Sequence, residues 1–250
     1  MKITVLTLFP ATIQSFLNES IIARAIKKGQ VEIEIINFRD FATDNYKTVD
    51  DRPYGGGAGM VLKIEPIAKA LAKTEGYKNK KIVMTSPRGK VFNQDIAREY
   101  ALLDNLILIA GHYEGFDERV ASLVDEEISL GDFILTGGEI PVATIIDSVV
   151  RLLPQVLKKD DATEIESFFQ VDIDELIKAV GDNQQLLELK KSGKTQIRLL
   201  EYSQYTRPEK YLDMEVPVDL LSGDPKKIRG WQLKNSFEIT LKRRPDLLNS

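Results

Sequence analysis

The sequence contains no cysteine, and only one histidine and one tryptophan among its 250 residues. Without cysteine the chain can form neither a disulfide framework nor a thiolate zinc site, and it has no thiol nucleophile. The single histidine, His112, excludes a metal centre made of several imidazoles. This composition is natural for a reducing compartment and predicts a cytoplasmic protein.

Long apolar runs are also missing. No segment reaches the roughly 20 residues that a membrane-spanning helix needs, and the first ten residues lack the apolar core and cleavage site of a signal peptide. We therefore expect no membrane partner. The hydrophobic content of 43% and the charged content of 29% are those of an ordinary globular protein, long enough for one large or two moderate domains.

The net charge of −4 is unevenly distributed. Residues 223–250 contain seven basic and three acidic residues, so this tail carries +4 and the rest of the chain carries −8. A local cationic surface attracts phosphates even on an acidic protein. A solvated helix face explains the same charges equally well.

The apolar pattern changes along the chain. Short apolar runs at 2–8, 31–36, 81–85 and 106–110 predict strands, and helices are expected from Pro10 to about Ile26, from Asn93 to about Leu103 and over 141–153. This alternation predicts an α/β domain with a helix-covered parallel sheet over about the first 155 residues. Beyond a polar segment at 158–167 only helices are expected, at 171–191 and after the N-cap Asp224.

Four glycines within five positions follow Asp50, Arg52 and Tyr54, as Gly55-Gly56-Gly57-Ala58-Gly59. Glycine costs folding entropy, so such a run needs a reason. A backbone without Cβ atoms can approach a phosphate, a ribose or a base closely. A flexible linker is the alternative, although linkers are usually richer in serine and solvated.

Three more glycine-containing turns follow predicted strands, at 85–89, 110–119 and 129–141. Because loops at the carboxyl ends of parallel strands meet at one edge of the sheet, we expect one composite pocket. The common nucleotide signatures are excluded: Ser192-Gly193-Lys194-Thr195 has Glu188 where a P-loop needs glycine, and Gly55-x-Gly57 is followed by Met60 where a dinucleotide motif needs its third glycine.

Taken together, these segments closely resemble the bacterial tRNA (guanine-N1)-methyltransferases that modify the guanine at position 37, next to the anticodon. The resemblance covers nearly the whole chain in order. Its carriers are Leu8-Phe9-Pro10, Arg39-Asp40-Phe41, 50–60, Gly111 with Tyr113-Glu114-Gly115, 117–120, Gly131-Asp132, Gly137-Gly138-Glu139, 146–149, Tyr205-Thr206-Arg207-Pro208, Leu221-Ser222-Gly223 and Arg243-Arg244-Pro245.

The resemblance implies the knotted (SPOUT) class of α/β fold, with a parallel sheet, helices on both faces and a C-terminal trefoil knot. It implies a knotted domain at 1–157, an interdomain linker at 158–170 and a smaller all-helical tRNA-binding domain at 171–250. Residues 171–201 are an apparent insertion relative to the family. A homodimer with its active sites at the subunit interface is implied as well.

The methyl donor implied by the family is S-adenosylmethionine, and the resemblance also implies Mg²⁺, whose ligands the sequence does not identify. The donor would be contacted by residues of the three later turns. By resemblance these are Ser86, Pro87, Gly111, Tyr113, Glu114, Gly115, Leu130, Gly131, Asp132, Phe133, Ile134, Leu135, Gly137, Gly138 and Pro141.

Methylation at N1 needs a base, because neutral guanine carries a proton there, and it needs a positive group near O6, where negative charge develops. The family pattern assigns these catalytic roles to Glu166 and Arg151. Contacts with the tRNA are implied for a further set of residues. These are Asp50, Arg52, Tyr54, Gly55, Gly56, Gly57, Arg207, Lys226, Arg229, Arg243 and Arg244.

This chain departs from the family pattern at the proposed base. The family has an aspartate before Ser-Phe in the linker, and here Glu166 precedes Ser167-Phe168. The residues alone also allow a solvated linker carboxylate for Glu166 and an intrahelical ion pair with Asp147 for Arg151. Two other functions stay open: a tRNA-binding protein that has lost catalysis, and a knotted methyltransferase for another nucleoside.

Overall fold

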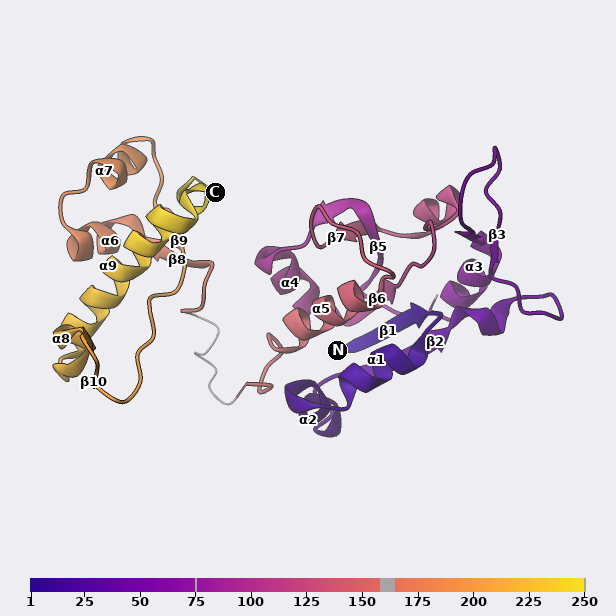
Figure 1. The fold of residues 1–250 in the computed structure, drawn as a ribbon, viewed down its shortest axis with the longest axis horizontal. Coiled ribbons are helices and arrows are strands. Elements are labelled where there is room, and N and C mark those ends of the chain that lie inside the picture. Colours follow the sequence, from indigo (N-terminus) through magenta and orange to yellow (C-terminus); the bar gives the residue numbers. More distant parts are fainter. Residues whose placement is uncertain (75, 158–164, 250) are drawn as a thin grey trace. The chain divides into compact units, whose positions relative to one another are not determined.

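The computed structural model describes residues 1–74, 76–157 and 165–249 (Figure 1). The chain divides into two compact units, 1–160 and 161–250, and each is considered by itself. Of the predicted linker, residues 158–164 lie outside the described part. In the described residues, no helix combines the length and the apolar character needed to cross a bilayer.

The first unit contains a five-stranded sheet in the order β2-β1-β6-β5-β7, in which every pair of neighbours is parallel. The sequence prediction of a parallel sheet is confirmed. The strands are β1 (Lys2–Thr7), β2 (Glu32–Asn37), β5 (Lys80–Val91), β6 (Asn105–Ile109) and β7 (Glu126–Ser129). A separate hairpin is formed by β3 (Asp50–Asp51) and β4 (Val61–Leu62).

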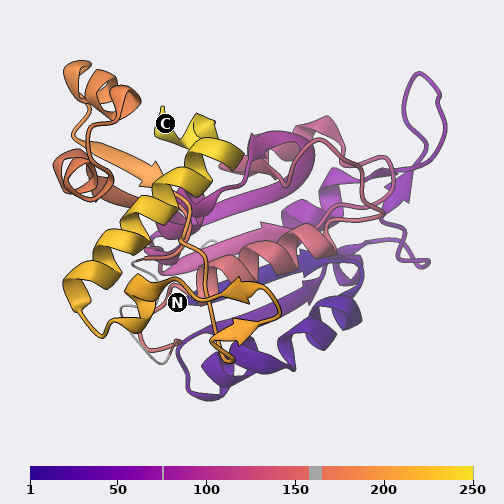
Figure 2. The same ribbon diagram turned by 60° about the vertical axis from the view of Figure 1, so that its left-hand side comes forward.

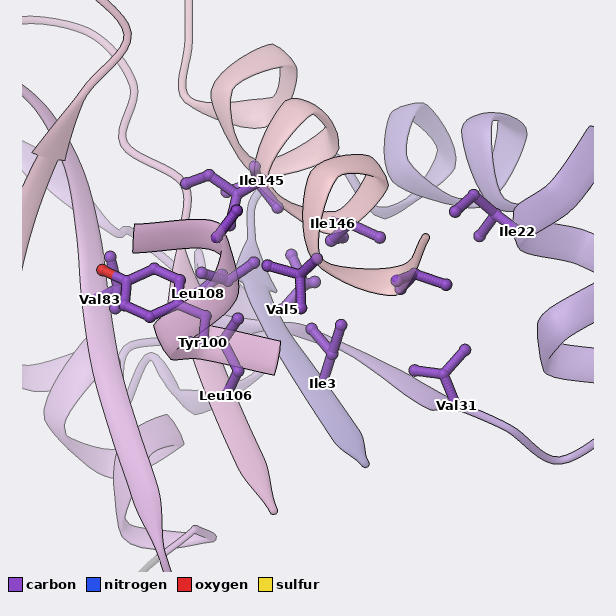
Figure 3. Packing of buried hydrophobic residues seen from close by; sticks show 14 of the residues in the cluster. Ile3, Val5, Ile22, Val31, Val83, Tyr100, Leu106, Leu108, Ile145 and Ile146 are labelled. Carbon is purple, nitrogen blue, oxygen red and sulfur yellow. The ribbon is translucent and has the colours of Figure 1, made fainter. Parts of the chain in front are cut away.

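Helices cover both faces of this sheet, as predicted. One face packs against α1 (Pro10–Leu17), α2 (Ser20–Lys27), α4 (Gln94–Ala101) and α5 (Glu139–Val150). Figure 3 shows Ile145 and Ile146 of α5 above the strand residues Val5 and Leu108. The opposite face packs against η1 (Phe38–Phe41), α3 (Ile64–Ala72) and η2 (Glu118–Leu123). Strands buried on both faces need apolar side chains at consecutive positions, which explains the short apolar runs.

Several element boundaries differ from the predictions. The helix expected from Pro10 to Ile26 is two helices, because the chain turns at Asn18 and Glu19. Asparagine favours such helix ends, and here the Asn18 side chain accepts a hydrogen bond from the Gln14 side chain. The strand expected to end at Thr85 resumes at Lys90 after a bulge. The Asn93 cap is confirmed, since its side chain accepts hydrogen bonds from two backbone N–H groups of the first turn of α4.

The second unit is not all-helical, and the helix predicted over 171–191 is wrong. A strand β8 (Phe169–Asp172) pairs antiparallel with β9 (Gln196–Leu199), and between them lie α6 (Ile173–Val180) and α7 (Gln184–Lys191). Gly181, with φ of 85°, ends α6. The alternation of Phe169 and Val171 with polar neighbours was a strand signal, and it was overlooked beside the longer helical pattern that follows.

The remaining elements of the second unit are mostly helical. The long helix α9 begins after Asp224, whose side chain caps it as predicted, and has Pro225 at its first position (Figure 2). Helix α9 spans Pro225–Arg243, and the other elements are the hairpin β10 (Lys210–Tyr211) with β11 (Met214–Glu215), α8 (Val218–Leu221) and η4 (Pro245–Leu248). The core of the unit combines residues of 169–199 with Leu233, Phe237 and Leu248.

Candidate active site

The bulged part of β5 and the loops that follow β6 and β7 meet at one edge of the sheet and enclose a pocket of about 500 Å³. This volume lies within the usual range for small-molecule sites. Of the fifteen residues predicted to contact a cofactor, fourteen line this pocket, and only Asp132 does not. The expectation of one composite pocket at the strand ends is therefore confirmed, whereas the ligand of the pocket stays a prediction.

The loops after β6 and after β7 touch through their backbones. The N–H of Gly138 donates to the carbonyl of Gly111 at 2.7 Å, and His112 forms a single β-bridge with Gly137. A Cβ atom on Gly138 would lie 2.4 Å from Oγ1 of Thr85 and 2.5 Å from the N of Gly111. No side chain fits there, so glycine at this position is a condition for the contact between the loops.

Sequence reasoning missed several polar residues of the pocket lining, among them Arg88, His112, Asp117 and Glu118. Arg88 lies in the bulged part of β5 and Glu118 begins η2 after β6, and an ion pair of 2.9 Å joins their side chains. The Arg119 guanidinium lowers the pKa of the Asp117 carboxyl to about 2 through a side-chain hydrogen bond. The Asp117-Glu118-Arg119 run was expected in a strand-end turn and as part of a family motif, but its charged side chains were not named as pocket residues, although charged residues in such a loop are a usable signal.

A buried carboxylate lies against Gly137 of the pocket lining. Glu139, the first residue of α5, is 6% exposed, and its Oε1 accepts a hydrogen bond of 2.7 Å from the hydroxyl of Thr7 at the end of β1. The same hydroxyl accepts a hydrogen bond from the N–H of Phe9, whose ring lies 4.7 Å from that of His112. A position at a helix N-terminus also favours the negative charge. These contacts tie β1 to the loops that line the pocket.

The glycine run forms the loop of the β3–β4 hairpin, so it is not a linker between domains. Four of its glycines have positive φ, for example 137° at Gly57, which a side chain rarely allows. The tRNA-contact candidates at 50–57 do not line the pocket. Their hairpin is nevertheless joined to it, because the N–H of Glu114 donates to the Met60 carbonyl and a Cβ on Gly59 would lie 2.5 Å from the Glu114 carboxylate.

The two predicted catalytic residues belong to different units. Arg151 directly follows α5 in the first unit and is not among the residues that line the pocket. Glu166 lies in the second unit, where its carbonyl accepts a hydrogen bond from Phe169. Two residues after Glu166, Phe168 has φ of 77°, a conformation that is strained for a bulky residue.

The cationic residues of the second unit differ in their surroundings. Arg229 forms an ion pair of 3.0 Å with Glu175 of α6, and Arg244 forms one of 2.7 Å with Asp246, which lowers the pKa of that carboxyl. Arg207, Lys226 and Arg243 are exposed. Over residues 1–74, 76–157 and 165–249, no three carboxylate or imidazole groups gather closely enough to hold a metal ion.

Comparison with known proteins adds independent information. The family described as "tRNA (Guanine-1)-methyltransferase TrmD" matches residues 1–250. A protein of Fusobacterium nucleatum named tRNA (guanine-N(1)-)-methyltransferase is 47% identical over 251 residues, covering 100% of this chain and 92% of that protein. Proteins of the same name from Carboxydothermus hydrogenoformans and Enterococcus faecalis are 48% and 43% identical; they cover 99% and 100% of this chain and 87% and 92% of their own lengths.

The buried pair of Thr7 and Glu139 can be tested by substitution. Thr7→Val removes the hydroxyl and leaves the Glu139 carboxylate buried without that donor, so we expect the free energy of unfolding to fall by about 1–3 kcal/mol. Thr7→Ser keeps the hydroxyl and should lose less. Urea unfolding measures both variants, and equal stability of Thr7→Val and the parent protein would contradict this role for the pair.

Proposed function

This chain belongs to the tRNA (guanine-1)-methyltransferase family, and from this premise we propose that it transfers the methyl group of S-adenosylmethionine to N1 of the guanine at position 37 of tRNA. We place this activity in the cytoplasm. The pocket formed by three strand-end loops is the observation that carries the proposal, because a methyl donor needs such a site and the residues expected from the family gather there.

The lining of the pocket suits S-adenosylmethionine. Of the carboxylates that the described part of the chain contributes to the lining, Asp117 is paired with Arg119 and Glu118 with Arg88, so the Glu114 carboxylate is the one available to a positive group of the ligand. Backbone N–H and C=O groups of the glycine-containing loops are available to an adenine, and the volume of about 500 Å³ admits a ligand of this size. When bound, S-adenosylmethionine supplies an electrophilic methyl carbon on its sulfonium.

The protein's own groups then have two tasks. The Glu166 carboxylate takes the N1 proton of guanine, so that the N1 lone pair forms the new bond to carbon while the carbon–sulfur bond breaks and its electron pair stays on sulfur. The Arg151 guanidinium stabilises the negative charge that develops on O6 in the transition state. Magnesium stays a prediction from the family resemblance and enters no step here, since the described residues form no cage for it.

We also propose that residues 85–138 form the trefoil knot of the family. Ile128 of β7 pairs with both Thr85 and Lys90 of β5, so residues 86–89 bulge out of the pairing with β7, which supports the proposal. A Cβ on Gly89 would lie 2.5 Å from the backbone N of Ile128, which supports close threading at this point. Such crossings are rare among folds, and sequence patterns other than family resemblance do not predict them.

A homodimer with its pockets at the subunit interface is part of the same proposal. Phe133, Ile134 and Ile140 are 54%, 81% and 57% exposed, although they lie beside the pocket in the first unit. Neighbouring exposed apolar side chains are typical of interaction surfaces. A second copy of this chain is the partner that the family resemblance implies.

Position and donor are tested with tRNA transcripts. We expect label from methyl-labelled S-adenosylmethionine to enter a transcript with guanine at position 37, and no label to enter the matched transcript with adenine there. Equal labelling of both would instead indicate another target nucleoside. No transfer, with tRNA binding intact, would favour a binding protein without catalysis.

The role of Glu166 is tested by two substitutions. Glu166→Gln is isosteric but cannot accept the proton, so we expect kcat to fall by about 10²- to 10⁴-fold with little change in tRNA affinity. Glu166→Asp keeps a carboxylate and introduces the residue that the family has at this position, so activity should stay within roughly tenfold. Unchanged single-turnover rates in Glu166→Gln would remove this residue from the mechanism.

The dimer surface is tested with Ile140→Asp, because a charge buried in an apolar interface opposes association. Sedimentation should show a shift toward monomer and methyl transfer should fall with it. Leu102→Asp is the matched control, since Leu102 is 81% exposed in the same unit and lies after α4, outside the exposed group at 133–140. A dimer unaffected by Ile140→Asp would argue against this surface.

A further inference from the structure

The second unit has a pocket of its own on α9, with a volume of about 390 Å³. Six of its lining residues repeat along one face of the helix, at the spacing of an amphipathic stripe. They are Lys227, Gly230, Trp231, Lys234, Asn235 and Glu238, joined by Asp219 of α8 and Ala179 of α6. The buried stripe of α9 is a different one, with Leu233, Phe237 and Thr240, so this pocket is not part of the core.

Gly230 is unexpected in this stripe because it lies in the interior of a 19-residue helix. Glycine lowers helix stability there relative to alanine. No packing accounts for it, since a Cβ on Gly230 would meet nothing within 4 Å. The absence of a side chain therefore leaves open space in the pocket next to the indole of Trp231.

Trp231, the only tryptophan of the chain, is held in place by two tyrosines. The rings of Tyr202 and Tyr205 approach it edge to face, with centroid distances of 6.4 and 6.0 Å. Edge-to-face contacts of this kind are favourable and fix the orientation of the ring. The indole is thus a preorganised wall of the pocket, which lowers the entropy cost of stacking a ligand against it.

The charged groups of the pocket lining complete the pattern. Within the described part of the chain, Lys227 and Lys234 form no ion pair or hydrogen bond, in contrast to Arg229 on the same helix, which is paired with Glu175. Asn235 is oriented by the hydrogen bond that its Oδ1 accepts from the N–H of Ser203. The carboxylates of Asp219 and Glu238 supply acceptors at the same site.

We propose that this pocket binds one unpaired nucleotide of the tRNA, with its base stacked on Trp231. Lys227 and Lys234 face the phosphates on either side, and Asp219 or Glu238 accepts a hydrogen bond from an exocyclic amino group of the base. Unpaired bases splayed from RNA loops are recognised by such combinations of aromatic rings and polar groups. The inference rests on the proposed tRNA substrate and assigns that substrate a second anchor, on the second unit.

Filling the pocket is the decisive test. Gly230→Gln places a good helix former where glycine stands, so we expect the melting temperature to be unchanged or higher while the Kd for tRNA rises about tenfold. Trp231→Leu should weaken binding similarly, and Trp231→Phe should retain part of the affinity. Binding is measured with the full chain by anisotropy of a fluorescein-labelled anticodon stem–loop RNA. Quenching of the single tryptophan reports the same event in the parent protein.

The charge contribution has a matched control on the same helix. Lys234→Gln removes a cation inside the pocket, and Lys242→Gln removes an exposed one in the last turn of α9, outside the pocket. We expect the first to weaken RNA binding several-fold more than the second. Equal losses, or tRNA affinity unchanged in Gly230→Gln and Trp231→Leu, would overturn the proposal and leave only unspecific attraction of phosphates.

A kinetic readout separates this inference from the proposed function. With the parent protein active on tRNA, Gly230→Gln should raise KM for tRNA about tenfold and leave kcat within about twofold. If the parent protein methylates tRNA and Gly230→Gln has the same KM for tRNA, the role of the pocket is refuted and the proposed function stands. Absence of methyl transfer by the parent would refute the proposed function, and the anisotropy series would still decide whether RNA uses the pocket.

Discussion

The close approach of two backbones at Gly111 and Gly138 is the constraint on which the first unit depends. The hydrogen bond between them holds the loop after β7 against the loop after β6, and the backbone of Gly138 lies so close to Thr85 that no Cβ atom fits between them. Because interiors are close-packed, any side chain there would displace the chain segments that line the pocket. Directly after Gly138, the buried hydrogen bond between Thr7 and Glu139 ties β1 to the start of α5. Pocket shape and fold stability are therefore determined by the same few atoms.

The sequence made much of this unit predictable, because apolar runs of strand length and their helical partners follow simple periodicities. The order of loops along the chain was enough to predict the pocket at the strand ends. The bulge at 86–89 was not predictable, because the strand signal simply stops at Thr85 and its resumption at Lys90 depends on pairing with β7. The charged lining residues Arg88 and Glu118 were missed for a related reason: their ion pair joins positions thirty residues apart.

The second unit was predicted less well, and its core explains the difference. Seven of the ten buried residues in its hydrophobic cluster come from 169–199, including Phe169, Leu176 and Leu186. These residues pack against Leu233 and Phe237 of α9, so the apparent insertion is an integral part of the unit and not an appendage. A pattern read along one segment does not reveal such a partner. The helical pattern over 171–191 therefore predicted neither β8 nor β9, and it predicted one helix where Gly181 separates α6 from α7.

The number of cations in the second unit does not show how many of them are available to a nucleic acid. The tail from 223 to 250 carries an excess of cations, but Arg229 forms an ion pair with Glu175 and Arg244 forms one with Asp246. Exposed pairs of this kind add little stability, so their main effect is to reduce the field available to an approaching polyanion. What remains for a nucleic acid on α9 includes Lys227 and Lys234, which border a pocket with an aromatic wall. Specific recognition then depends on where the unpaired cations stand relative to Trp231 and not on how many the tail contains.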